Sequence, residues 1–174
     1  MALAAATVLE VQLAGSDVNG GGFVTGAAGT DYSLIATARA NGGADGSSVL
    51  AVAVGSTTIT CADAQFGTTI VGNIVYFAGG TGSIVGTWRQ VTARASSTSI
   101  TIDASIAAST GMTMNIGGAL ATPGQAMAIA VVAAQIVYIK YSETPYSITS
   151  ASTNIAGGCL TSSVAKSVIG YNTT

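Results

Sequence analysis

Short stretches in which apolar and polar residues alternate run along most of the chain, and glycine-rich segments separate them. Alternation of this kind puts the apolar side chains of a β-strand on one face. Runs that are rich in Val, Ile and Thr and bounded by turn residues are typical of strands. The pattern predicts strands near residues 7–13, 48–54, 57–61, 73–77, 88–94, 98–103, 112–116, 135–140, 146–150 and 164–171. An all-β fold is therefore expected.

Two of these strands are predicted to form a hairpin. Residues 88–94 and 98–103 both alternate, and the link between them is short enough for a tight connection. Ile100 and Ile102 share one face of the second strand. Residues 112–116 likewise carry three apolar side chains on one face.

One segment departs from the strand pattern and predicts a single short helix near residues 123–134. Alanine, which favours helices, dominates residues 125–134. Thr122 suits the capping position, and Pro123 suits the first helical position.

The pattern divides the chain into three parts. Residues 1–46 are expected to form an extended glycine-rich arm, because they hold too little apolar bulk for a core of their own. Residues 47–117 are expected to form a small antiparallel β module rich in Thr. Residues 118–174 are expected to hold the short helix and further strands. Phe23 and Tyr32 would anchor the arm on another subunit.

The polar residues of the first part offer one alternative, a calcium loop built from Asp17, Asn19 and Asp31. Their spacing does not match an EF-hand, which needs more carboxylates and a closing Glu. A phosphate-binding loop is weaker, because its Lys and its Ser or Thr are missing. No metal site is therefore predicted.

Composition changes the picture of the surface. Only 7% of the residues are charged and the formal net charge is −2, whereas a soluble domain has about 25% charged residues. A chain with so few charged groups is expected to cover much of its surface with other subunits.

Charge and hydropathy also argue against two classes of partner. The five basic residues are scattered and form no stripe that would neutralise nucleic-acid phosphates. No apolar run of about 20 residues predicts a membrane span. The apolar start lacks a basic region before it, so no signal peptide is expected.

Catalysis is not expected either. The chain has no His, which Ser-His-Asp and Cys-His sites require. Its seven acidic residues lie singly rather than as a facing pair. No catalytic residue and no cofactor are predicted. Cys61 and Cys159 are expected to be small buried apolar side chains, with a bridge between them left open.

Several segments resemble parts of tailed-bacteriophage virion proteins. Residues 15–23 (GSDVNGGGF) with 29–33 (GTDYS) are similar to an N-terminal segment of such proteins. The run from 71 to 103 resembles a β module that often stands ahead of a β-helix. The Ala-rich helix, the strand that ends at Lys140 and the later residues 146–148 resemble the opening coil of pectate-lyase-like proteins and phage tailspikes.

This resemblance implies a structural role in a phage virion, as a capsid-decoration or head-fibre protein or as a tail or adaptor protein. It would be assembled in the bacterial host cytoplasm and would contact other virion proteins. It also implies a β-helix-like fold for residues 118–174. The alternative is a self-assembling bacterial surface or filament protein that uses strand stacking.

The chain is also expected to form a homo-oligomer, with a trimer suggested by analogy to fibrous phage proteins. Two β-helix-like coils would leave apolar faces and strand edges to be covered by other chains. Trp88 is expected in the core or in a subunit contact rather than in a sugar-binding groove, because Arg89 and Gln90 are its only long polar neighbours in sequence. The residues expected at subunit contacts are Phe23, Tyr32, Trp88, Ile136, Tyr138 and Tyr146.

Overall fold

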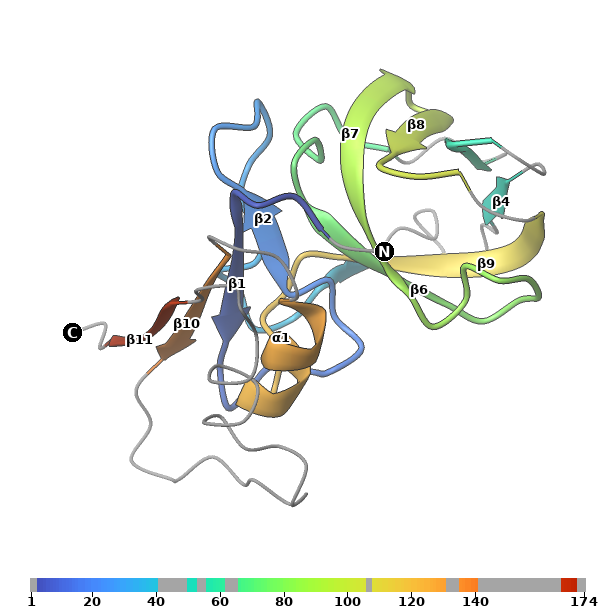
Figure 1. The fold of residues 1–174 in the computed structure, drawn as a ribbon. Helices are drawn as coiled ribbons and strands as arrows, with labels where there is room; N and C mark the ends of the chain where they lie inside the picture. Colours follow the sequence, from blue (N-terminus) through green and yellow to red (C-terminus); the bar gives the residue numbers. More distant parts are fainter. Residues whose placement is uncertain are drawn as a thin grey trace.

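The computed structural model describes residues 3–40, 50–52, 56–61, 66–105, 108–130, 135–140 and 167–171. Within these ranges the chain forms eleven strands in two sheets and one short helix (Figure 1). The predicted all-β fold class is thus confirmed. The elements are β1 (Thr7–Val11), β2 (Gly22–Val24), β3 (Arg39–Ala40), β4 (Leu50–Val52), β5 (Thr58–Cys61), β6 (Ile74–Ala78), β7 (Trp88–Ser96), β8 (Ser99–Ile102), β9 (Ser109–Ile116), α1 (Pro123–Ile129), β10 (Ile136–Lys140) and β11 (Ser167–Tyr171).

The larger sheet is a small antiparallel barrel. Its strand order is β3-β9-β4-β5-β8-β7-β6, and β9 also pairs with β6. Six of the seven strands therefore close into a ring, which leaves few unpaired strand edges. The interior holds one apolar cluster: Ile59, Cys61, Phe66, Ile70, Val75, Phe77, Ile84, Val91, Ile100, Ile102, Met112, Met114 and Ile116.

The barrel follows the predicted alternation closely. β7 and β8 form the expected hairpin, in which Ser96 pairs with Ser99. Ile100 and Ile102 both point into the core, as does Val91 on the facing strand. The three apolar residues of β9, which are Met112, Met114 and Ile116, are buried together as expected.

The smaller sheet has the order β11-β10-β1-β2. β10 runs parallel to both β1 and β11, while β2 is antiparallel to β1. The helix α1 lies beside β1 and β10 and covers this sheet (Figure 1). A second apolar cluster fills the space between them: Leu3, Leu9, Val11, Ile74, Leu120, Ala126, Ile129, Ala130 and Val137.

The expectation that residues 1–46 form an extended arm is wrong for the described part. β1 is an interior strand of the smaller sheet, and Leu9 and Val11 are fully buried within their own chain. Phe23 is only 8% exposed. The apolar bulk that the first part lacks comes from β10 and α1, more than a hundred residues later. The described residues of the first and third parts of the chain therefore build one unit.

The strand β6 is shared by the two cores. Val75 points into the barrel, while its neighbour Ile74 belongs to the second cluster. This division follows from the two-residue period of a strand. Backbone contacts reinforce the joint, because the N–H groups of Gly20 and Gly21 donate to the carbonyls of Gly117 and Gly118 at 2.8 and 2.9 Å.

The predicted helix is confirmed at its start. Thr122 is the N-cap, its Oγ1 accepts a hydrogen bond from the Gln125 N–H at 3.2 Å, and Pro123 opens the helix. Residues 131–134 and the predicted strand at 146–150 lie outside the described residues. No described helix has the length and apolar character needed to cross a membrane.

Candidate contact surface and cavity

The three residues of the alternative calcium loop serve separate structural roles. Asp17 accepts hydrogen bonds from the N–H groups of Ala121 and Thr122, and the Asn19 side chain donates to two backbone carbonyls. Asp31 accepts from the Ser33 N–H and hydroxyl. No group of three or more metal-ligating side chains gathers anywhere in the described ranges.

The residues expected at subunit contacts are distributed over both sheets. Phe23 is buried, and Tyr32 packs half-buried against the barrel core with the Arg39 guanidinium 4.5 Å from its ring centre. Ile136 and Tyr138 lie half-buried on β10, whose two edges are both paired within the chain. Tyr146 lies outside the described residues, and so does Cys159, whereas Cys61 is buried as expected.

The large apolar side chains that the described structure does expose lie elsewhere, on two loops. Leu13, Val18, Leu34 and Ile35 are 47%, 48%, 57% and 46% exposed. We call these four residues the apolar loop pair. The Leu34 carbonyl accepts a hydrogen bond from the Gln12 side chain at 2.8 Å, which ties one loop to the other.

Further hydrogen bonds hold the apolar loop pair in place. The Asn19 side chain donates to the Ala36 carbonyl at 2.9 Å, and the Ala119 N–H donates to the Ile35 carbonyl at 2.7 Å. Both loops are thus fixed to the body of the protein. The sequence signal for these loops is the adjacent pair Leu34 and Ile35, neither of which is among the residues expected at subunit contacts.

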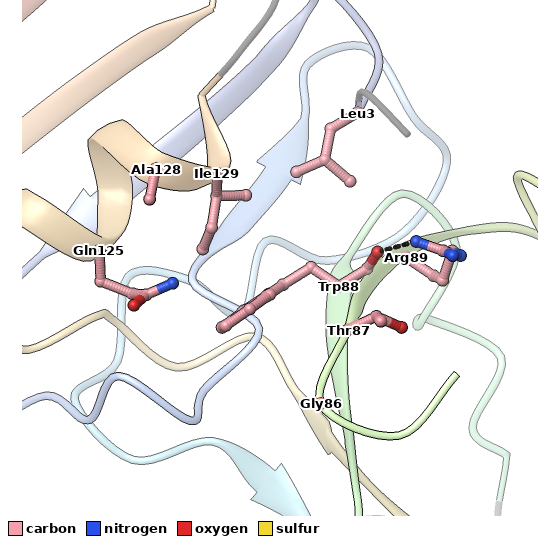
Figure 2. A pocket seen from close by; sticks show the side chains of 8 residues that line it. All are labelled: Leu3, Gly86, Thr87, Trp88, Arg89, Gln125, Ala128 and Ile129. Atoms are coloured by element: carbon pink, nitrogen blue, oxygen red, sulfur yellow. Dashed lines mark hydrogen bonds between the residues drawn. The ribbon is translucent and has the colours of Figure 1, made fainter. Parts of the chain in front are cut away.

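A cavity of about 400 Å³ lies between the helix and the barrel, where α1 faces the start of β7 (Figure 2). Trp88, Thr87, Arg89 and Gln125 contribute aromatic and polar groups to its walls. Apolar side chains supply much of the remaining surface, and these are Leu3, Ala128 and Ile129. None of the lining residues is acidic.

Trp88 is held firmly at this cavity. Its Nε1–H donates to the Asn19 carbonyl at 2.8 Å, and its ring lies 4.7 Å from that of Tyr76 at an angle of 50°. The ring is half-buried and packs against the second apolar cluster. The helix places the Gln125 side chain at the same cavity as Trp88. Gln125 lies 37 positions from Trp88 in sequence, so the sequence around Trp88 does not predict this neighbour.

No protein-family model, curated protein or solved structure matches this chain. Its geometry and composition therefore carry the functional argument.

Proposed function

We propose that this chain is a structural component of a tailed-bacteriophage virion that acts through subunit–subunit contacts. It would serve as a capsid-decoration or head-fibre protein, or as a tail or adaptor protein. The observation that carries the proposal is the apolar loop pair, which offers four large side chains to a neighbour from a surface poor in charge.

The energetics favour association through these loops. Each side chain is about half exposed, so covering it contributes about 1 kcal/mol. The loops are already ordered by hydrogen bonds, which lowers the entropy cost of docking. A net charge of −2 opposes contact between copies only weakly.

The smaller sheet supports a β-helix-like C-terminal part. β1, β10 and β11 stack in parallel and in register, with Val8 opposite Ile136 and Ile136 opposite Ser167. Parallel stacking of successive strands is the arrangement on which β-helices are built. β11 is the end strand of this sheet in the described structure (Figure 1).

The protein would then be a homo-oligomer with closed symmetry, for which a trimer remains the proposal by analogy. Sedimentation velocity and electron microscopy test this with the double variant Leu34→Asn/Ile35→Asn. We expect the unaltered protein to form a finite oligomer. The variant should sediment as a 16.9 kDa monomer with an unchanged circular dichroism spectrum.

Ala95→Asn, at an exposed position on β7 outside the loops, is the matched control and should assemble normally. A monomeric unaltered protein, or a loop variant that assembles as well as the control, would contradict the proposal.

The second candidate is a bacterial surface or filament protein, which the end strand β11 favours, because a row of backbone donors and acceptors can be extended by another strand. Micrographs separate the two. Closed particles of fixed size support the virion component, whereas filaments of indefinite length support strand stacking.

A further inference from the structure

The Trp88 cavity has a chemical character that the assembly role does not use. Its volume of about 400 Å³ far exceeds the space of about 30 Å³ that one water molecule occupies. It falls at the lower end of the roughly 300–1,000 Å³ range of small-molecule sites. The cavity therefore has room for a compact ligand.

The aromatic wall of the cavity is prearranged. The indole N–H of Trp88 is satisfied by the Asn19 carbonyl, so no donor of this ring is left for a ligand. What the ring offers is an apolar surface whose face carries negative electrostatic potential. Tyr76 supports the ring and limits its movement. A ligand would therefore meet a rigid aromatic wall without a cost for ordering it.

The polar wall has hydrogen-bonding capacity to spare. The Gln125 side-chain amide, which has two donor hydrogens and an acceptor oxygen, makes no hydrogen bond to a described residue. The Arg89 Nη1 donates to the Trp88 carbonyl at 2.8 Å, and the Arg89 Nε is fully buried, so a ligand in the cavity does not reach that nitrogen. The free hydrogen-bonding capacity of the wall therefore lies at Gln125.

We propose that this cavity binds a single pyranose unit of a glycan. The C–H groups on one face of a pyranose ring would lie against Trp88, and its hydroxyl groups would bond to Gln125 at the edge. A purely apolar ligand would leave the Gln125 side-chain amide without a hydrogen-bond partner. A phosphorylated ligand would meet one cationic side chain in the walls, where phosphate sites use several donors.

This inference revises the expectation that Trp88 is not part of a sugar-binding groove. That expectation rested on Arg89 and Gln90 being the only long polar neighbours of Trp88 in sequence. In the structure α1 supplies a further amide, since Gln125 and Trp88 line the same cavity (Figure 2). No residue of the apolar loop pair lines the cavity, so the inference does not rest on the proposed assembly.

The experiment uses the fact that Trp88 is the only tryptophan in the chain. Its fluorescence is recorded during titration with methyl glucoside, methyl galactoside, N-acetylglucosamine and glucuronic acid, and saturation-transfer NMR is recorded on the same mixtures. We expect at least one of these sugars to shift the emission saturably and to protect Trp88 from acrylamide. Gln125→Ala, which keeps a good helix former in α1, should weaken the response about tenfold.

Gln90→Ala is the matched control, because Gln90 lies on the same strand as Trp88 but does not line the cavity. It should respond as the unaltered protein does. The proposal is overturned if none of the four sugars shows saturation transfer or changes the emission. It is also overturned if glycerol acts equally well, or if a folded Gln125→Ala variant responds without loss.

Discussion

Gly20 marks the tightest point of the joint between the two sheets. A Cβ atom placed there would lie 1.9 Å from the Ile74 carbonyl oxygen and 2.9 Å from the Gly117 nitrogen. Both are backbone atoms of paired segments, so neither can move aside cheaply. The density of glycine that suggested a loose arm in the sequence thus serves close backbone approach instead.

Substitution of Gly20 tests this role. Gly20→Ala is expected to lower the free energy of unfolding by about 3 kcal/mol, because the added methyl group forces the backbones apart. Urea denaturation followed by circular dichroism measures the change. Gly67→Ala is the control, since its nearest neighbour would be 3.9 Å away and its backbone is not left-handed. Equal stability of the two variants would disprove the close-packed joint.

Asp103 provides a prediction of pH dependence. Burial raises the pKa of its carboxyl above the ordinary value of 3.8, against the opposing effects of a hydrogen bond from the Gln90 N–H and the nearby Arg89 charge. Between 3.8 and the raised pKa the folded protein holds more protons than the unfolded chain. Asp103 therefore stabilises the fold most below pH 3.8, and this contribution is lost as pH rises through the folded pKa.

Asp103→Asn keeps an oxygen that can accept from the Gln90 N–H but removes the ionisation. We expect this variant to match the unaltered protein below pH 3.8 and to be the more stable of the two at neutral pH. Chemical denaturation across this pH range measures the difference. A parallel pH dependence in both proteins would show that another group is responsible.

At the scale of elements, α1 depends on a residue from the opposite end of the chain. Asp17 accepts from the N–H groups of Ala121 and Thr122 at 3.0 and 2.9 Å and from the Thr122 hydroxyl at 2.8 Å. Thr122 in turn caps the helix. Thr122 and Pro123 predicted the start of the helix from the sequence. The hydrogen bonds to Asp17 could not be predicted, because Asp17 and Thr122 are more than a hundred residues apart.

Asp17→Ala should therefore destabilise the protein by about 2 kcal/mol, since it leaves two backbone donors and one hydroxyl without their acceptor. Thermal or urea denaturation gives the value. Asp31→Ala, which removes hydrogen bonds only to Ser33 within its own turn, is the matched comparison and should cost less. The reverse order would contradict the role assigned to Asp17.

For the whole molecule, the shared strand β6 predicts that the two cores unfold together. Leu9→Ala removes apolar contacts from the second cluster and should cost about 3 kcal/mol. We expect circular dichroism, which follows all the strands, and Trp88 fluorescence to show one common transition that shifts to lower denaturant. Ala95→Ser, at an exposed position on β7 outside the apolar loop pair, should leave the transition almost unchanged. Separate midpoints for the two signals would show that the barrel folds independently of the smaller sheet.

The sequence by itself determined the features that neighbouring residues encode. The alternation in β7, β8 and β9 predicted which side chains are buried, and Thr122 with Pro123 predicted where the helix begins, because strand period and capping act within a few residues. Only the tertiary structure decided that residues 3–40 are not an arm, that β6 and β9 close a barrel, and that Gln125 and Trp88 line one cavity. Those outcomes depend on which segments, distant in sequence, bury the most apolar surface against each other. Local periodicity does not predict such contacts.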